Sequence, residues 1–456
     1  MKRKLILLLV LLFGAFGAAY LSYKRSAQEA GTKHRWLESD SVAAIESRTR
    51  RDFTLTRQEF AQAAMEKYPW LTDEQIDSFI ALKYIEARII NDTLRIHRKA
   101  VRNFGILCPK AGEHFSGRGA TASQARISYV DSVLDYYAGE NAVGNARRVK
   151  YRFSIDVPYA AAIQGDSLRV WMPLPVESDR QSDIEIIDAS HPYIRSNGRS
   201  CHNSVYMLAQ APQPGDTAHF ELTAAFTTSG KYCKEENILS NLKPYDKNSE
   251  EYKKYTSFDN RHIVSLDSLA HAIVGDETNP YRQSELVFDY IAKNYPWAGA
   301  LEYSIIPCIP QYVVEQHHGD CGQVSLLYIS LMRTLGIPAR WESGWMLHPG
   351  ELNLHDWAEV YFEGVGWLPV DVSFGRYSGS DKAEISGFYS HGIDSHRMAV
   401  NKAVGGDFYP KKKYIRSETV DFQVGEVETT RGNLFYPMWN YHMEILENQP
   451  IEILNK

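Results

Sequence analysis

The segment that decides the fold reads GDCGQVSLLYISLMRTLGIPAR, residues 319–340. Apolar residues recur in it at steps of three and four, a pattern typical of a helix with one buried face. Asp320 fits the N-cap, because its carboxylate can accept hydrogen bonds from the free amides of the first turn. Gly336 and Pro338 follow the apolar run and predict the end of the helix. The apolar positions of this face are Val324, Leu327, Tyr328, Leu331, Met332 and Leu335.

Cys321 stands in the first turn of this predicted helix. The positive end of a helix dipole favours the thiolate over the thiol, which prepares a cysteine to act as a nucleophile. A cysteine taken alone, however, is more often a small apolar core residue. The nucleophile interpretation therefore depends on partners elsewhere in the sequence.

Two candidate partners flank a predicted hairpin downstream. His355 begins the apolar strand that ends near Glu363, and Asp371 ends the strand after the glycine-containing turn. Because the turn lies at the opposite end of both strands, antiparallel pairing can bring His355 and Asp371 together. Asp371 can then accept a hydrogen bond from one imidazole nitrogen, while the other nitrogen faces Cys321. A thiolate and an imidazolium oriented by a carboxylate form the working arrangement of a cysteine acyl-transfer enzyme.

The same segments resemble a known family. Residues 284–375 resemble the core of the transglutaminase-like superfamily through GDCGQ, GIPAR, HDWAEVYF and GWLPVDVSFG, which occur in this order. The resemblance implies a papain-like α+β fold and a catalytic triad of Cys321, His355 and Asp371. A small residue usually follows the histidine in this family, whereas Asp356 stands here. Its carboxylate could raise the pKa of the imidazole, bind a cationic group of a substrate, or point to solvent, and we expect solvent.

An oxyanion hole would combine the Cys321 amide with one side-chain donor. The resemblance implies that the segment NYPWAGALEYS supplies an indole or a phenol to it. Trp297 is the first candidate, followed by Gln311 and Tyr303. Packing under the helix is the alternative for all three, and it is the favoured interpretation for Tyr303.

We predict neither a metal nor a cofactor. A metal ion would compete for the thiolate, and no histidine spacing in this region matches a helical zinc pair. The histidines of this region that could serve as metal ligands are His317, His318, His348, His391 and His396.

The rest of the chain predicts an α+β protein of several parts. A length of 456 residues is too long for one ordinary core, and 44% hydrophobic with 23% charged residues describes a globular protein. Apolar periodicity predicts helices in the first third, one of them from Thr72 to Ile90, and period-two alternation predicts an antiparallel β-sandwich next. The predicted parts are a signal peptide or N-terminal membrane anchor at 1–24, a linker at 25–50, a helical accessory region at 51–147, the β-sandwich at 148–232, a connecting segment at 233–260, a transglutaminase-like core at 261–400, and strands at 401–456 that complete or cover the core.

The N-terminus predicts export. Residues 1–4 are positively charged, residues 5–23 are almost entirely apolar, and Gly17-Ala18-Ala19 fits a signal-peptidase site. The apolar run is also about long enough to span a bilayer, so both a cleaved signal and a membrane attachment through residues 5–23 remain open. We expect a periplasmic protein or a membrane-anchored one that faces the exterior.

The net charge limits the classes of binding partner, and the cysteine count limits the possible disulfides. A net charge of −6 without a long basic block argues against nucleic acid. Five cysteines in an oxidising compartment leave one unpaired, and Cys321 is the candidate for it. Cys201 and Cys233 could form a disulfide, whereas Cys108 and Cys308 are predicted to be buried thiols.

These observations predict thiol-dependent acyl transfer on amide bonds of a peptide or protein. Bacterial members of the superfamily are mostly regarded as peptidases or amidases, which favours hydrolysis over the amine transfer of a protein-glutamine γ-glutamyltransferase. The alternative is not an enzyme but a catalytically silent periplasmic binding or assembly protein. The flanking regions support it, because they contain no candidate catalytic residues of their own. The intact set of Cys321, His355 and Asp371 counts against that alternative.

Overall fold

The computed structural model describes residues 39–112, 142–162, 166–376 and 383–451, together with residues 130 and 134. Of these, residues 39–49 belong to one unit and the residues from Arg50 onward to another. The first described element is α2 (Ser39–Asp52). The predicted signal or anchor segment lies outside the described residues, and none of the helices that are described is long and apolar enough to cross a membrane.

Residues 55–112 combine short helices with a small antiparallel sheet, so this region is not purely helical as the sequence suggested. The sheet has the strand order β1-β3-β2. Phe60, Ile76 and Phe104 belong to one buried apolar cluster that holds the helices against the sheet. The elements are β1 (Leu55–Thr56), α3 (Arg57–Lys67), α4 (Asp73–Ala81), β2 (Ala87–Ile90), β3 (Thr93–Ile96), α5 (Ala100–Leu107) and α6 (Pro109–Gly112).

The single helix predicted from Thr72 to Ile90 is wrong in its second half. Its start is confirmed, because Thr72 makes a capping box at the first turn of α4. The helix ends at Ala81, and the chain then turns through Lys83, whose φ is 65°. Residues 87–90 pair with β3 instead. Short apolar runs fit both helical and strand spacing, which explains the error.

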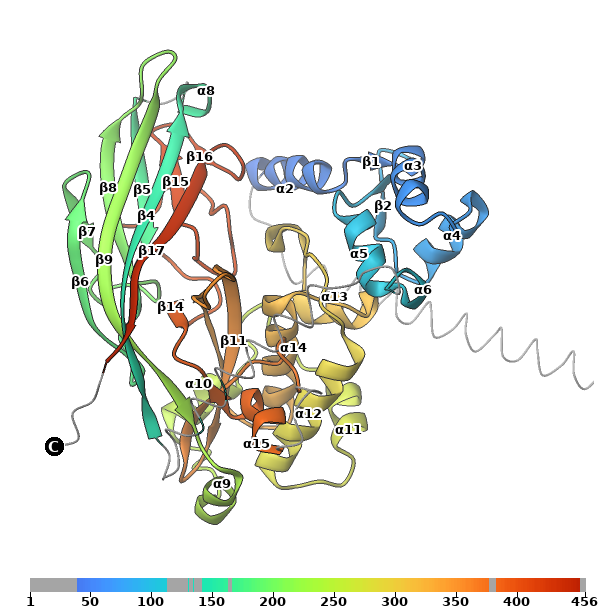
Figure 1. Cartoon of the computed structure of the whole chain (residues 1–456), viewed down its shortest axis with the longest axis vertical. Coiled ribbons are helices and arrows are strands. Elements are labelled where there is room, and N and C mark those ends of the chain that lie inside the picture. Colours follow the sequence, from blue (N-terminus) through green and yellow to red (C-terminus); the bar gives the residue numbers. More distant parts are fainter. Residues whose placement is uncertain are drawn as a thin grey trace, which may run out of the picture. The chain divides into compact units, whose positions relative to one another are not determined.

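The motifs identified in the sequence lie in a layer of helices on a four-stranded antiparallel sheet of order β12-β11-β10-β14. Helix α14 is buried from Gly322 to Arg333 and packs against β10 and β11. Figure 1 shows α11 to α14 together on one side of this sheet. The predicted helix at Cys321 and the predicted hairpin are both confirmed. The elements are α11 (Asp267–Val274), α12 (Pro280–Asn294), η1 (Tyr303–Ile305), α13 (Ile309–Gln316), α14 (Cys321–Thr334), β10 (Ala339–Met346), β11 (Asn353–Phe362), β12 (Gly366–Val370), α15 (Ala383–Ser386), η2 (Phe388–Ser390) and β14 (Arg397–Asn401).

Two further antiparallel sheets form the β-rich part. One has the order β13-β9-β4-β17 with β6 on β9, and the other has the order β16-β15-β5-β8-β7. Helices α9 and α10 connect this part to the helical layer. The elements are β4 (Ala142–Pro158), α8 (Tyr159–Ala162), β5 (Ser167–Pro173), β6 (Gln181–Ala189), β7 (Tyr193–Arg195), β8 (Ser204–Gln210), β9 (Thr217–Tyr232), α9 (Glu235–Asn241), α10 (Glu250–Thr256), β13 (Gly392–Ile393), β15 (Glu426–Thr429), β16 (Asn433–Leu434) and β17 (Asn440–Pro450).

The C-terminal strands do not complete the four-stranded sheet of β10, β11, β12 and β14. Strand β17 pairs with β4 and β15 pairs with β5, so both extend the sheets of the β-rich part. Residues 418–424, which lie in the segment 401–456 that was predicted to form strands, form bends and loops. The pairing partners lie almost 300 residues apart in the sequence for β17 and β4, so the local pattern cannot specify them.

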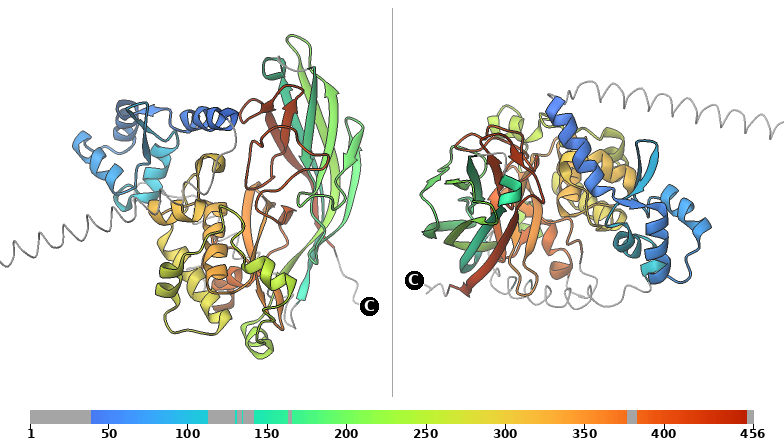
Figure 2. Two further views of the ribbon diagram at one scale, coloured as in Figure 1. Left: turned by 180° about the vertical axis from the view of Figure 1, so that it is seen from behind. Right: turned by 90° about the horizontal axis from the view of Figure 1, so that it is seen from above.

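One hydrophobic core joins the β-rich part to the sheet under α14. Trp345 and Leu347 at the end of β10, and Met398 and Val400 of β14, pack into the same cluster as the inner residues of β4, β5, β8 and β9. The four-stranded sheet is therefore covered by helices on one face and by the β-rich part on the other, as both views of Figure 2 show. Burial on both faces holds β11 rigidly, and β11 carries His355.

Candidate active site

A pocket of about 960 Å³ opens at the N-terminal end of α14. Cys321 lies at this end of the helix, and His355 and Asp356 reach the pocket from β11. Trp297 and Tyr303, from the segment before α13, line it as well. The fold therefore brings residues of three separate sequence motifs to one cavity.

His355 and Asp371 form the contact that the hairpin predicted. The Nε2 atom of His355 lies 2.7 Å from Oδ2 of Asp371, and both side chains are buried. Asp371 also accepts from Nη1 of Arg397 at 2.9 Å and from Oγ of Ser373 at 2.8 Å. The carboxylate is held by three donors, and it leaves Nδ1 as the imidazole nitrogen available to another partner.

The charges around this pair explain its protonation. Burial alone would raise the pKa of Asp371, but His355 and Arg397 hold that pKa well below its ordinary value. Burial lowers the pKa of His355, and Asp371 opposes that effect only in part. Asp371 is therefore ionised at neutral pH and His355 is uncharged, which is the state in which an imidazole can accept a proton.

Cys321 makes a contact that the sequence did not predict. Its Sγ atom lies 3.5 Å from Oδ2 of Asp356, and within the described residues it has no hydrogen bond to His355. Asp356 is only 3% exposed, so the expectation that it points to solvent is wrong. Neighbouring side chains on a strand point in opposite directions. Asp356 accordingly faces α14, whereas His355 faces Asp371.

The environment of the thiol opposes its ionisation. Burial raises the pKa of Cys321 well above its ordinary value, and the carboxyl groups of Asp356 and Asp320 raise it further. The prediction that the helix terminus lowers this pKa is wrong for the structure, because a helix dipole contributes less than desolvation next to carboxyl groups. The thiol and the imidazole are both uncharged here.

The first turn of α14 is fixed by a tight set of contacts. Asp320 is the N-cap, as predicted, and it accepts from the Gln323 amide at 3.0 Å in a capping box. The Tyr303 hydroxyl donates to the same carboxyl group at 2.6 Å. Any side chain at Gly322 would collide with this hydroxyl, because a Cβ atom would lie 2.3 Å from it and 2.6 Å from Oδ2 of Asp356. Tyr303 thus positions the helix start, which agrees with a packing role.

Trp297 remains the candidate for an oxyanion donor. Its backbone runs beside Gly319, two residues before Cys321, and its side chain lies at the pocket with 41% exposure. The guanidinium of Arg102 lies 5.4 Å from its ring centre. The indole therefore already lines the pocket, partly exposed and in contact with Arg102.

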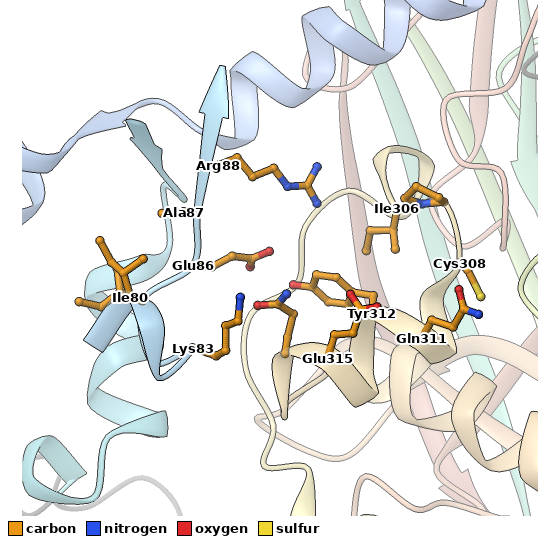
Figure 3. Close-up of a pocket in the computed structure, with 13 residues that line it drawn as sticks. Ile80, Lys83, Glu86, Ala87, Arg88, Ile306, Cys308, Gln311, Tyr312 and Glu315 are labelled. Atoms are coloured by element: carbon orange, nitrogen blue, oxygen red, sulfur yellow. The ribbon is translucent and has the colours of Figure 1, made fainter. Parts of the chain in front are cut away.

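Gln311 does not lie at this site. It lines a different pocket of about 340 Å³, together with Cys308 and Tyr312 of the same segment and with Glu86 across from them. Figure 3 shows Gln311 beside Cys308 and the carboxyl group of Glu86 directed toward Tyr312. The eight-residue helix α13 turns Gln311 away from Cys321, so Gln311 is not a donor for an oxyanion there.

Comparison with known proteins identifies this part of the chain. Residues 267–372 match the family model of the transglutaminase-like superfamily. The chain contains a transglutaminase-like domain. A segment of 157 residues is 30% identical to YebA of Bacillus subtilis and covers 28% of this chain but only 20% of YebA. An uncharacterized protein of Haemophilus influenzae is 21% identical over 340 residues, which are 64% of this chain and 89% of that protein.

Two solved structures match this chain at low sequence identity. A protein from Cytophaga hutchinsonii described as a "Putative Cysteine Protease" has 17% sequence identity and a TM-score of 0.46, covering 67% of this chain and 93% of that one. The periplasmic domain of TgpA from Pseudomonas aeruginosa, bound to ethylmercury, has 12% identity and a TM-score of 0.22, with 55% and 94% covered.

The other cysteines and histidines that the structure describes lie outside the pocket of the transglutaminase-like domain. All five cysteines are free, so Cys201 and Cys233 do not form the disulfide that seemed possible. His348 and His396 belong to a buried cluster around Asp394 beside Arg397. Among the described residues, no group of three or more His, Cys, Asp or Glu side chains is arranged to hold a metal ion.

Sequence reasoning missed three residues that complete the site of the transglutaminase-like domain. Arg397 supports Asp371 from β14, Gln423 donates to Oδ1 of Asp356 at 2.7 Å, and Asp421 lines the same pocket. They come from segments 26 to 67 residues beyond their partners. No motif or periodicity marks these positions, so the sequence offered no signal for them.

Proposed function

We propose that the transglutaminase-like domain is a thiol-dependent enzyme that hydrolyses amide bonds in a peptide or protein. The observation that carries this proposal is the buried pair of His355 and Asp371, of which His355 lines the same pocket as Cys321. A neutral imidazole held by an ionised carboxylate is the arrangement that removes a proton from a nucleophile. The superfamily match over residues 267–372 supports the same chemistry.

The proposed reaction starts from an uncharged thiol and imidazole. His355 accepts the thiol proton on Nδ1 as Sγ of Cys321 attacks the carbonyl carbon, and the carbonyl oxygen becomes an oxyanion. The Cys321 amide and the Trp297 indole would stabilise that oxyanion. His355 then protonates the amine, the C–N bond breaks, and a thioester with Cys321 remains. Water adds to the thioester, giving a carboxylic acid and the free thiol.

Amine transfer is the alternative outcome of the same thioester. If a primary amine attacks in place of water, a new amide forms and the enzyme is a cross-linking transferase. We favour hydrolysis, because the pocket is large and in part lined by exposed residues such as Trp297. Incubation of the protein with a peptide and a labelled amine tests this choice, and predominant incorporation of the label would overturn it.

A second candidate is a binding protein without turnover. The hydrogen bond from Cys321 to Asp356 and the raised pKa of the thiol favour it, because both keep the sulfur protonated. The enzyme remains the better proposal. Ser373 and Arg397 hold the Asp371 carboxylate, which in turn orients His355. Burying such a polar network costs free energy, and the orientation of a catalytic imidazole gives a reason for it.

A peptide-cleavage assay with matched cysteine variants separates the two candidates. The full chain is incubated with a peptide library, and new carboxyl termini are detected by mass spectrometry. We expect Cys321→Ser to lose activity and Cys308→Ser to keep it, because Cys308 lies in the other pocket. If no peptide is cleaved by the parent protein, or if both variants behave alike, the enzyme proposal is wrong.

We further propose that the chain is exported. The positive residues 1–4 and the apolar residues 5–23 support this proposal. Expression of the full chain with a C-terminal tag, followed by fractionation, tests it. Recovery of the tagged protein only in the cytoplasm would contradict export, while retention in the membrane fraction would indicate an uncleaved anchor.

A further inference from the structure

Asp421 is a buried carboxyl group at the active-site pocket without a partner of its own. It is 6% exposed and lines the pocket that also holds Cys321. Within the described residues its carboxyl oxygens make no hydrogen bond and no ion pair. The guanidinium of Arg416 donates to the backbone carbonyl of Asp421 and pairs with Glu426. Its charge lowers the pKa of the Asp421 carboxyl group, but burial and the neighbouring Glu418 outweigh it.

Asp356 connects Asp421 to the nucleophile. One oxygen of Asp356 accepts from Gln423 and the other from the Cys321 thiol. Burial raises the pKa of Asp356, and the neighbouring carboxyl group of Asp421 raises it further. The two carboxyl groups therefore act on one another beside the sulfur.

A buried carboxylate without a partner is costly, and native proteins normally satisfy such a group with a ligand, water or ion. The described residues offer no set of three or more ligands for a metal ion, so an organic cation is the better candidate for the ligand of Asp421. Tyr436, Trp439 and Tyr441 line the pocket too, and aromatic rings attract cations. An alkylammonium group can donate three hydrogen bonds to carboxyl oxygens.

We infer that Asp421, with Asp356 beside it, binds a primary ammonium group of the substrate next to the amide that Cys321 attacks. The inference rests on the proposed function for its link to an amide, but the ammonium site itself does not require turnover. The amine can belong to the acyl-donor peptide, as an amino terminus or a lysine-like side chain, or to an amine that accepts the acyl group. Both have the same charge and hydrogen-bonding chemistry.

Calorimetric titration of the full-length Cys321→Ala protein tests this site without catalysis. The probes are alanyl-alanine amide, its N-acetyl counterpart, and cadaverine. We expect a free amine to bind about tenfold more tightly than the acetylated peptide, since a charge-assisted contact is lost on acetylation. Preference for the peptide amine assigns the site to the acyl donor, and preference for cadaverine assigns it to the acceptor.

Variants identify the residue responsible. Asp421→Asn should remove the preference for the free amine, whereas Asp407→Asn should keep it, because Asp407 is exposed and outside the pocket. Circular dichroism checks that each variant is folded, and Asp421→Glu, which keeps the charge, should retain part of the preference. Equal binding of free and acetylated probes, or a preference that survives Asp421→Asn, would overturn the inference. Failure of the cleavage assay alone would overturn the proposed enzyme and leave this binding result standing.

Discussion

At the scale of single residues, Asp371 determines how strongly His355 holds a proton. Burial lowers the pKa of His355 below 6.5, and Asp371 raises it in part. Asp371→Asn should therefore lower this pKa further, so the acid limb of kcat/KM moves to lower pH. The value of kcat/KM itself should fall by about 10²–10⁴-fold, because the imidazole loses the partner that orients it.

Profiles of kcat/KM for peptide cleavage between about pH 4 and pH 9, chosen to bracket the ordinary histidine pKa, check this prediction. Ser373→Ala is the milder comparison, since it removes one of three donors to Asp371 and leaves the His355 contact in place. An acid limb that stays in place or moves to higher pH in Asp371→Asn would show that His355 is not the group being titrated.

Gly322 is the residue at which steric contact can be tested most directly. Glycine to alanine within a helix normally stabilises by about 1 kcal/mol, but here the new Cβ would meet the Tyr303 hydroxyl at 2.3 Å and Asp356 at 2.6 Å. Overpacking of this kind costs about 1–3 kcal/mol. We expect Gly322→Ala to lower the free energy of unfolding, and Tyr303→Phe in the same chain to restore part of it.

Urea denaturation of these variants measures the effect. Gly432→Ala serves as the control, because nothing lies within 4 Å of a Cβ atom there. A Gly322→Ala protein as stable as the parent would mean that Tyr303 and Asp356 move aside readily, and the site would then be less rigid than the contacts indicate.

At the scale of elements, the start of α14 depends on the carboxyl group of Asp320, which accepts two hydrogen bonds. Asp320 accepts from the Gln323 amide and from the Tyr303 hydroxyl. Asp320→Ala should destabilise the protein by at least about 2 kcal/mol, from the lost cap and the unpaired hydroxyl together. Asp320→Asn retains an acceptor oxygen and avoids a buried charge, so its cost should stay within about 1 kcal/mol.

Thr56→Ala is the matched comparison, since Thr56 closes the same kind of capping box on α3, away from the active-site pocket. Thermal unfolding and peptide cleavage are measured for all three variants. We expect Thr56→Ala to reduce stability by about 1 kcal/mol without changing kcat/KM, whereas Asp320→Ala reduces both. Equal effects of Asp320→Ala and Asp320→Asn would contradict the role of the acceptor oxygen.

Elements that depend on local signals were predictable, and others were not. Helix α14 and its N-cap follow from apolar spacing and capping within 22 residues, and the hairpin of β11 and β12 follows from one short turn. The stretch from Tyr84 to Ile90 fits two periodicities, so it was assigned to a helix instead of β2. The partners of β15 and β17 are set by tertiary packing, which a local pattern does not encode.

At the scale of the whole molecule, the site is assembled from distant segments. The contact between His355 and Asp371 could be predicted because their motifs lie close together in the sequence. Asp356 could not be placed, because β11 is buried on both faces and alternation no longer separates inside from outside. Asp421 comes from a segment without regular structure whose position depends on the packing of β15 against β5.

A buried carboxyl group without a partner, such as Asp421, should cost the whole molecule stability. Burial raises the pKa of Asp421 well above its ordinary value of 3.8. The folded state therefore binds a proton that the unfolded state releases, and stability falls as the pH rises above the unfolded pKa. Asp421→Asn removes this penalty, so we expect a free energy of unfolding about 1–3 kcal/mol higher at neutral pH, with the gain vanishing below about pH 4.

Urea denaturation at several pH values measures this gain in stability. Asp407→Asn is the control, because the Asp407 carboxyl group is exposed, and we expect it to show no gain. A variant that is less stable than the parent at neutral pH would mean that Asp421 is satisfied within the protein, and the ammonium site would lose its physical basis as well.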